Sequence, residues 1–350
     1  MSSQLPLKVA IIGTGIFAKN EHLPSFQKLP HLFKVHACYN RSRGKAEEFA
    51  KLAGITTIYE SLEDAFKDPE IDVVDALLPV EYNEEVVALA VKYNKPLCFE
   101  KPIAATLAAA HKIVDLAATP EAPLIVVLEQ WAYYKAIPLI KEKLERIGNV
   151  VSFAYSSTGQ FNFNNKYLAT TWRQKPKHVG GFLSDGGVHQ LALLTGILGP
   201  VASVSARSRQ VREQSGTDDV AYSLFTTDSG AIGSFTYGSA FGNTAKTCYF
   251  QILGDNGSIY YDFSPGSKPT VTARYGGATP ESKNSEETIV IEDENFGASQ
   301  ELKLFGEALI SGDSANCITV PELTFHHLAI VDAIVNSNKE GGKVIDVEKL

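Results

Sequence analysis

The chain is short of cysteine, of excess positive charge and of long apolar runs. Its four cysteines, Cys38, Cys98, Cys248 and Cys317, are scattered and form no Cys-x-x-Cys pair. This argues against a zinc finger or a disulfide framework and favours a reducing compartment. Acidic residues outnumber basic ones by 40 to 32, which is not the balance of a nucleic-acid-binding protein. No apolar run approaches the roughly 18 residues that a membrane span needs. We therefore predict a cytoplasmic protein that binds neither nucleic acid nor a membrane.

What the chain does have is length and a regular alternation of patterns. Its 350 residues suit two domains, predicted at 1–129 and 130–350. In the first, nearly continuous apolar runs alternate with segments of helical period, which is typical of a parallel sheet covered on both faces. We predict an α/β Rossmann domain, a doubly wound parallel sheet with its site at the carboxyl ends of the strands. The expected strands are 8–13, 33–39, 73–78, 96–99 and 124–128, and the expected helices are 46–52, 62–66, 84–93 and 107–117.

The pattern changes after about residue 130. Successive β-rich runs are separated by the turn signals Asp228-Ser229-Gly230 and Asp255-Asn256-Gly257. This predicts an α+β domain with an open, largely antiparallel sheet. Small residues on one face of its strands indicate either a solvated face or a flat subunit interface. The expected strands are 150–156, 201–211, 220–226, 231–237, 247–253, 258–263 and 270–275, and the expected helices include 136–147, 298–310 and 321–336.

A glycine loop follows the first expected strand. Gly13-Thr14-Gly15-Ile16-Phe17-Ala18 fits the Gly-x-Gly-x-x-Gly/Ala pattern of dinucleotide-binding turns. The first glycine makes the tight turn, the second lets the backbone approach a pyrophosphate, and the small last residue lets helix and strand pack closely. An ordinary glycine-rich turn is the alternative, but the loop's place between a strand and a helix favours a dinucleotide.

The end of the second expected strand indicates which dinucleotide binds. An NAD-binding domain commonly carries a carboxylate there for the ribose 2′-hydroxyl. This chain has Asn40-Arg41-Ser42-Arg43 instead. Asn40 removes a charge that would repel a 2′-phosphate, and both arginines can donate to one. We predict NADP(H); the alternative is a polar turn with two solvated arginines.

Two further segments carry candidate catalytic groups. Lys101, preceded by Glu100 and followed by Pro102, comes at the end of an expected strand, and partial burial there would suit it for proton transfer. Asp185 and His189 are spaced i, i+4 and share one helix face. Gly186 and Gly187 between them would leave room for a flat ring. A surface lysine and a structural Asp–His pair are the competing interpretations.

Together these motifs resemble the Gfo/Idh/MocA family of oxidoreductases over essentially the whole chain, and most of all its fungal NADP-dependent members. The resemblance implies a Rossmann domain followed by a domain with an open antiparallel sheet. It also implies that Lys101, Asp185 and His189 are catalytic, that Leu78, Pro79, Glu100 and Lys101 contact the cofactor with the glycine loop, and that the protein forms a homodimer or higher homo-oligomer through the second-domain sheet.

The chain departs from the family pattern in two places. Where members often have Thr-Pro-x-x-x-His, it has Leu78-Pro79 and then Asn83, which cannot act as an acid or base. Where many members carry an arginine, it has the segment 129–134. We therefore expect a different substrate pocket, with Arg173 either meeting an anionic or oxygen-rich substrate or lying in solvent. The candidate substrate residues are Trp131, Tyr134, Tyr167, Trp172 and Arg173.

These observations predict an NADP(H)-dependent oxidoreductase acting on a carbonyl or secondary alcohol, with a sugar, a polyol or a small aldehyde or ketone as the expected substrate. Whether Lys101 or His189 carries the proton stays open. The alternative is a catalytically silent, dinucleotide-sensing regulator of the same fold. No metal is expected, because the side chains of adjacent His326 and His327 diverge on a helix. His22 is a candidate to lie near the nicotinamide.

Overall fold

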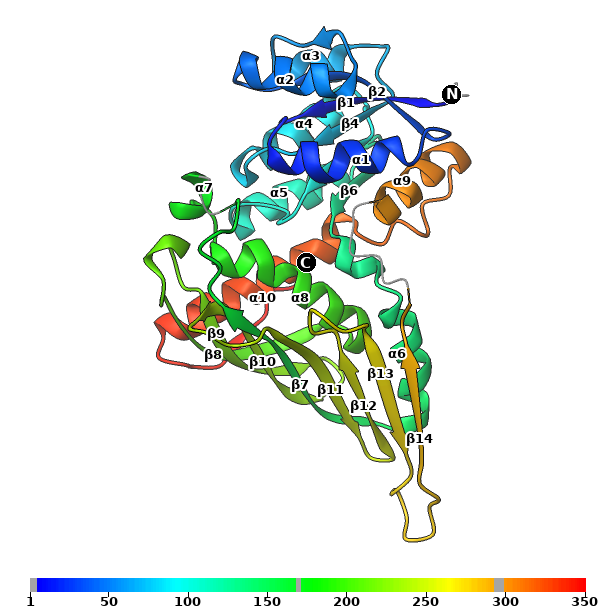
Figure 1. The fold of residues 1–350 in the computed structure, drawn as a ribbon, viewed down its shortest axis with the longest axis vertical. Coiled ribbons are helices and arrows are strands. Elements are labelled where there is room, and N and C mark those ends of the chain that lie inside the picture. Colours follow the sequence, from blue (N-terminus) through cyan, green and yellow to red (C-terminus); the bar gives the residue numbers. More distant parts are fainter. Residues whose placement is uncertain (1–4, 168–170, 293–298) are drawn as a thin grey trace. The chain divides into compact units, whose positions relative to one another are not determined.

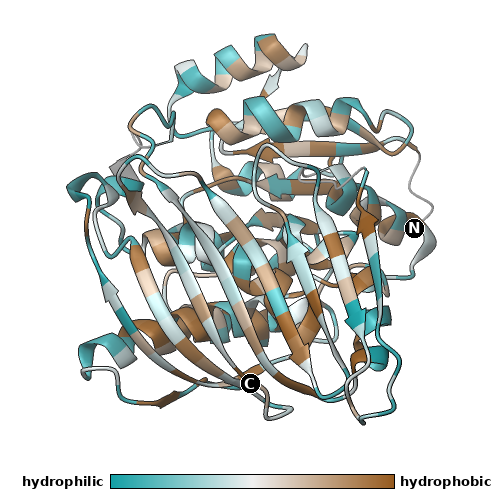
Figure 2. Cartoon of the chain, turned by 60° about the horizontal axis from the view of Figure 1, so that its bottom comes forward, coloured by the Kyte–Doolittle hydropathy of each residue, from teal (hydrophilic) through white to brown (hydrophobic). Residues whose placement is uncertain are grey.

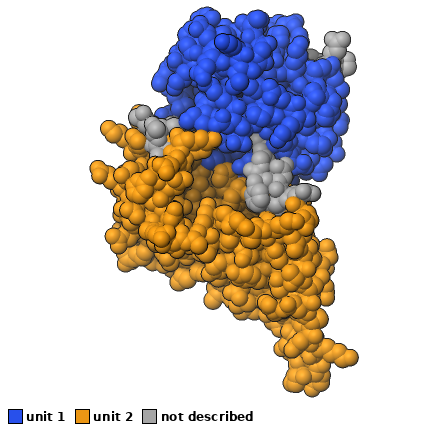
Figure 3. All heavy atoms as spheres, viewed as in Figure 1, with its two compact units in different colours: residues 1–130, 296–325, 350 blue, residues 131–295, 326–349 orange. Residues whose placement is uncertain are grey.

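The structure, a computed structural model, describes residues 5–167, 171–292 and 299–350, without the side chains of 171 and 172. The chain forms two compact units (Figure 3). Unit 1 comprises 1–130, 296–325 and 350, and unit 2 comprises 131–295 and 326–349. None of the described helices is long and apolar enough to cross a membrane.

Unit 1 contains a six-stranded parallel sheet in the order β3-β2-β1-β4-β5-β6 (Figure 1). This is the strand order of the doubly wound dinucleotide-binding fold, and it confirms the predicted Rossmann domain. The order reverses at β1, so the loop after β1 opens at the topological switch point. The strands are β1 Leu7–Ile12, β2 Phe33–Tyr39, β3 Thr57–Ile58, β4 Val73–Ala76, β5 Leu97–Glu100 and β6 Ile125–Leu128.

The helices of unit 1 begin and end at residues that suit those positions. Ser61 and Asp64 form a capping box at the start of α3, and Gly54 adopts the left-handed conformation at the end of α2. The helical segments are the π-helix η1 Ala18–His22, α1 Leu23–Gln27, α2 Arg43–Ala53, α3 Leu62–Lys67, the 3₁₀ turn η2 Val80–Tyr82, α4 Asn83–Lys92 and α5 Leu107–Ala117.

A helix from late in the chain also belongs to unit 1. This helix, α9 (Ser299–Ser311), packs closely on β2, because a side chain at Gly306 would come within 2.5 Å of the Phe33 ring. Ser299 also donates a hydrogen bond to Ser25 of α1. The sequence-based boundaries place α9 in the second domain, whereas its contacts group it with unit 1.

Unit 2 contains a nine-stranded sheet in the order β14-β13-β12-β11-β7-β10-β9-β8-β15 (Figure 1). Only β7 and β10 pair in parallel among its described strands, which confirms the predicted, largely antiparallel sheet. The strands are β7 Val150–Gln160, β8 Val201–Arg209, β9 Val220–Thr227, β10 Ile232–Phe241, β11 Thr247–Gly254, β12 Gly257–Asp262, β13 Thr270–Tyr275, β14 Ser285–Val290 and β15 Ile345–Asp346.

The two faces of this sheet differ. On one face, Tyr155, Phe225 and Phe235 stack in the core of unit 2. The other face, turned toward the viewer in Figure 2, carries exposed Tyr222 and Leu224 on β9. The helical segments are η3 Gln130–Tyr133, α6 Ala136–Leu144, η4 Glu145–Ile147, α7 Thr171–Gln174, α8 Phe182–Leu198, η5 Glu213–Ser215 and α10 Pro321–Lys339, of which the last begins in unit 1.

Candidate active site

The glycine loop of unit 1 has the geometry of a dinucleotide cradle. Gly13 has a φ of +91°, and a Cβ there would lie 2.3 Å from the backbone oxygen of Leu77, so only glycine fits this turn. A Cβ at Gly15 would meet nothing within 4 Å, so the space beside this backbone is open for a ligand. Ala18 is fully buried, as the third position of the motif requires. The residues present therefore fit a bound pyrophosphate.

Asn40 holds this loop from the end of β2. Its side-chain oxygen accepts a hydrogen bond from the Thr14 backbone N–H at 3.2 Å, and its amide donates to the Ser42 carbonyl, also at 3.2 Å. The buried Thr14 hydroxyl donates to the Lys45 carbonyl at 3.1 Å. The sequence accounted for Asn40 only as a missing charge. Its second role, as a clamp on the glycine loop, depends on a partner 26 positions away.

The two arginines that follow Asn40 differ in their partners. Arg43, the first residue of α2, pairs with the carboxylates of Glu47 at 3.2 Å and Glu60 at 2.6 Å. Arg41 instead donates to the neutral Tyr82 hydroxyl at 3.5 Å, which leaves its charge unbalanced by that contact. Both side chains are exposed. Arg41 is therefore the better placed of the two to meet a phosphate.

The turn that carries Lys101 is fixed through its backbone. β5 ends at Glu100, and the half-buried Lys101 follows it. The buried side chain of Asn83 donates its amide hydrogens towards three carbonyls, those of Glu100 at 3.3 Å, Pro102 at 3.0 Å and Ile103 at 3.2 Å. Asn83 thus clamps this turn at the position where the family resemblance led us to expect a histidine.

Leu78 and Pro79 lie at the same edge of the sheet. Both follow β4, the neighbour of β1, and a Leu78 methyl group lies 3.1 Å from where a Cβ of Gly13 would be. The carboxyl ends of β1, β2, β4 and β5 therefore bring all the predicted cofactor residues of unit 1 to one edge.

In unit 2, the predicted residues gather around α8. The guanidinium of Arg173 meets Asp185 at two points, 2.7 Å from Nε to Oδ2 and 3.4 Å from Nη2 to Oδ1. Arg173 also lies 5.0 Å from the ring centre of Tyr167, which is cation–π distance. The charge of Arg173 is thus directed at Asp185, and whether Arg173 also meets a substrate stays a prediction.

His189 lies against an aromatic stack. Its ring centre is 5.6 Å from that of Trp131 with the planes at 21°, and Trp131 in turn stacks on Tyr134 at 5.0 Å. Tyr134 is buried, so it supports Trp131 from behind. This stack orients the imidazole through ring packing. Trp172 lies in α7, and its side chain is outside the described part of the structure.

The glycines between Asp185 and His189 make room for an aromatic ring of unit 2 itself. The sequence led us to expect that Gly186 and Gly187 leave room for a flat ring. That room is filled by Tyr237 of β10, whose hydroxyl lies 2.1 Å from where a Cβ of Gly186 would be. The glycines therefore serve the packing of α8 on the sheet of unit 2.

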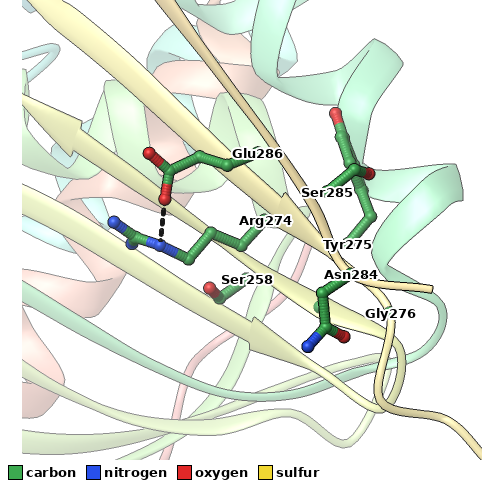
Figure 4. Close-up of a pocket in the computed structure, with 8 residues that line it drawn as sticks. Ser258, Arg274, Tyr275, Gly276, Asn284, Ser285 and Glu286 are labelled. Carbon is green, nitrogen blue, oxygen red and sulfur yellow. Dashed lines mark ion pairs between the residues drawn. The ribbon is translucent and has the colours of Figure 1, made fainter. Parts of the chain in front are cut away.

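A separate hollow of about 450 Å³ lies at one end of the sheet of unit 2 (Figure 4). Arg274 of β13 and Glu286 of β14 pair across it at 2.6 Å. This ion pair neutralises the charge that an ionic ligand would need, and no predicted site residue lines the hollow. Its lining residues are Gly257, Ser258, Arg274, Tyr275, Gly276, Asn284, Ser285 and Glu286.

Comparison with known proteins shows the family and the fold of the chain. Residues 7–128 match the sequence model of an oxidoreductase family's NAD-binding Rossmann fold, and residues 141–346 match that of the family's C-terminal alpha/beta domain. The chain is 46% identical to an uncharacterised protein of Saccharomyces cerevisiae, over 98% of this chain and 99% of that protein. The crystal structure of an oxidoreductase from Thermotoga maritima is 32% identical, with a TM-score of 0.84 over 97% of this chain and 98% of that one. Levoglucosan dehydrogenase in complex with NADH and L-sorbose shares the fold at 20% identity, with a TM-score of 0.82 over 98% and 99% of the two chains.

Proposed function

Because the chain belongs to the Gfo/Idh/MocA family of oxidoreductases, we propose that it transfers a hydride between NADP(H) and a carbonyl or secondary-alcohol substrate. The observation that carries the proposal is the clamped turn bearing Lys101, at the same sheet edge as the glycine loop. The substrate class is a sugar, a polyol or a small aldehyde or ketone. The complex of levoglucosan dehydrogenase with L-sorbose supports this class, because that enzyme has the same fold.

The residues of unit 1 divide the work of holding the cofactor. The glycine loop takes the pyrophosphate, and the first turn of the following helix offers backbone N–H groups to it. Arg41 takes the 2′-phosphate of the adenine ribose. When bound, the nicotinamide supplies the hydride acceptor or donor. The residues proposed to hold the whole cofactor are Gly13, Thr14, Gly15, Ile16, Phe17, Asn40, Arg41, Ser42, Arg43, Leu78, Pro79, Glu100 and Lys101.

The preference for NADP(H) over NAD(H) is tested by a matched pair of arginine variants. Arg41→Ala should weaken NADPH binding by about 10- to 100-fold, since hydrogen bonds to charged groups contribute about 1.5–3 kcal/mol. Arg43→Ala should weaken NADPH binding less than Arg41→Ala does, because Glu47 and Glu60 already pair with the Arg43 guanidinium. NADH binding should change little in either variant. Equal losses for the two variants, or equal losses for the two cofactors, would contradict this assignment.

Reversal of the preference gives a second test at the same position. Asn40→Asp combined with Arg41→Ala should favour NADH, because a carboxylate at position 40 can accept from the ribose hydroxyl and repels a 2′-phosphate. An aspartate oxygen can also still accept from the Thr14 N–H, so the loop clamp is retained. Dissociation constants for both cofactors measure the outcome, and an unchanged ratio would refute the inference.

Lys101 and His189 are the proposed proton carriers. In the oxidative direction one of them takes the hydroxyl proton of the substrate, and Asp185 orients the pair. General acid–base catalysis of this kind contributes about 10²–10⁴-fold. Lys101→Ala and His189→Ala should each abolish turnover while NADPH still binds. NADPH oxidation with a panel of aldehydes, ketones and sugars provides the assay.

The same assay separates an enzyme from a dinucleotide-sensing regulator. NADPH binding by the wild type without turnover of any panel member would favour the regulator. Retained activity in both variants would refute the catalytic assignment.

Self-association through the sheet of unit 2 is a further part of the proposal. Its exposed face carries Tyr222, Leu224 and Ile232, each more than half exposed, among small polar residues. Such a flat apolar face suits a homodimer or higher homo-oligomer. Leu224→Glu should lower the mass measured by light scattering, whereas Leu52→Glu, at an exposed position on α2, should not. An unchanged mass in Leu224→Glu would remove this face as the interface.

The cytoplasm is the proposed location. The four cysteines are unoxidised thiols, and all four are buried. This state fits a reducing compartment, where disulfides are rare. Cell fractionation tests the assignment, and recovery of the protein in an oxidising compartment would contradict it.

A further inference from the structure

A buried histidine links three segments of unit 1. His22 has no exposed surface, and its ring lies 2.8 Å from Asp75 (Nδ1 to Oδ2) and 3.2 Å from Glu100 (Nε2 to Oε1). Asp75 lies on β4 and is also fully buried, whereas Glu100 ends β5 and its side chain is 17% exposed. One ring thus joins the segment after the glycine loop to two neighbouring strands.

The local backbone turns His22 into this position. The helix after the glycine loop contains a π-helical turn, Ala18–His22, directly before α1. Pro24 has no N–H to donate and its ring disfavours a regular helical turn before it, which gives a physical reason for the wider turn. His22 also packs on the ring of Phe17, with the centres 5.2 Å apart. Phe17 belongs to the predicted cofactor loop, so His22 contacts both that loop and Glu100.

The surroundings hold His22 in its charged form. Burial lowers its pKa, but Asp75 and Glu100 outweigh burial and raise the pKa from 6.5 to about 10. The ring is therefore an imidazolium at neutral pH, and each nitrogen donates to one carboxylate. The carboxyl of Glu301, on α9, faces the same cluster. Glu129 and the Cys98 thiol also lie near it. Burial, and then the negative charge of Glu100, raise the pKa of Glu301 well above its usual range, so its carboxyl is neutral.

A metal site is the other use for such a cluster. Among the residues that the structure describes, no three or more histidine, cysteine or acidic side chains are arranged to hold a metal ion. The charged ring itself occupies the position between the two carboxylates. The cluster is built around a cation that the chain supplies.

We propose that His22 is a positioning residue for Lys101, acting through the side chain of Glu100. Glu100 directly precedes Lys101 in the chain, and the backbone carbonyl of Glu100 already accepts a hydrogen bond from the side chain of Asn83. His22 donates to the carboxylate of Glu100, so both the backbone and the side chain of Glu100 are fixed. The inference rests on the proposed catalytic role of Lys101. A displacement of about 1 Å at a catalytic group can cost about 100-fold in rate, which sets the expected scale.

Two amide substitutions at His22 test its two hydrogen bonds separately. Asparagine places a donor near the position of Nδ1, which faces Asp75, and glutamine places one near that of Nε2, which faces Glu100. His22→Asn should therefore lower kcat by about 100-fold, and His22→Gln by no more than about 10-fold. The KM of the substrate and the Kd of NADPH should stay within a few-fold of wild type in both. Melting temperatures are measured alongside.

A purely structural histidine predicts a different order. Loss of such a histidine would reduce stability and activity in parallel. His22→Asn would then keep a higher melting temperature and kcat than His22→Gln, because asparagine retains the hydrogen bond to the fully buried Asp75. Equal kcat in the two variants, or a kcat that follows the melting temperature, overturns the proposal.

A third variant guards against failure of the first two to fold. Glu100→Ala cuts the same link at its partly exposed end and should lower kcat as far as His22→Asn does. A kcat within twofold of wild type overturns the proposal. Lys101→Ala, measured in the same assay, separates the two hypotheses. If Lys101→Ala is inactive and Glu100→Ala is fully active, the proposed function stands and the positioning role falls. If Lys101→Ala is active, the catalytic role of Lys101 falls, and the positioning role of His22 falls with it.

Discussion

The candidate residues of unit 1 and those of unit 2 are held by different means. In unit 1, backbone geometry sets the site: a glycine turn under Leu77, a carbonyl clamp by Asn83, and a loop clamp by Asn40. In unit 2, side chains set it: Trp131 stacks on His189, and Arg173 pairs with Asp185. A cradle for a common cofactor needs a fixed backbone. The aromatic and ionic contacts of unit 2, in contrast, depend on the identity of each side chain.

The glycine loop should show the largest effect of any single change. Gly13→Ala places a methyl group 2.3 Å from the Leu77 oxygen in a left-handed backbone conformation. Strain of this kind costs about 1–3 kcal/mol, and the backbone overlap adds to it, so we expect a loss of about 3 kcal/mol or more. Urea unfolding measures the loss.

Gly15→Ala is the matched control for that prediction. A methyl group there meets nothing in the protein, so the free energy of unfolding should stay within about 0.5 kcal/mol of wild type. NADPH binding should nevertheless weaken at least tenfold, because the methyl group would occupy the space proposed for the pyrophosphate. Similar unfolding energies for the two variants would show that the loop does not depend on its first glycine.

Local patterns predicted most of the fold, and long-range partners account for what they missed. α5 begins and ends where its apolar period predicts, since Thr106 caps it through the Ala109 N–H. β14 was not predicted, because it is an edge strand with charged residues and lacks the apolar run that indicates a buried strand. The sequence made His22 a candidate to lie near the nicotinamide but could not predict its hydrogen bonds, because its partners lie 53 and 78 positions away.

A smaller effect is expected at the corresponding glycine of unit 2. Gly186→Ala would bring a methyl group 2.1 Å from the Tyr237 hydroxyl, the far end of a side chain rather than backbone. Overpacking of this kind costs about 1–3 kcal/mol. Because the closest atom is the hydroxyl, Tyr237→Phe should restore part of the lost stability in the double variant. A double variant less stable than Gly186→Ala alone would mean that the glycine serves another purpose.

The last prediction concerns the pH dependence of stability, which the charged cluster around His22 in unit 1 should set. His22 keeps its proton in the folded chain up to a pH of about 10, whereas the unfolded chain releases it above about 6.5. Stability should therefore fall as the pH rises from about 6.5 to about 10. Glu301 acts in the same direction, because its pKa is also raised on folding. Each such proton contributes at most about 1.4 kcal/mol per pH unit.

Glu301→Gln isolates one of these two contributions. The amide removes the cost of keeping a carboxyl protonated, so the variant should be more stable than wild type above a pH of about 4.5, by a margin that widens with pH. Glu307→Gln, at an exposed position of the same helix, should show a margin that does not widen. Urea midpoints between pH 5 and pH 8, at intervals of about one unit, measure both. A constant margin for Glu301→Gln would mean that its carboxyl is ionised in the fold. The cluster around His22 would then carry one more negative charge for its single imidazolium to balance.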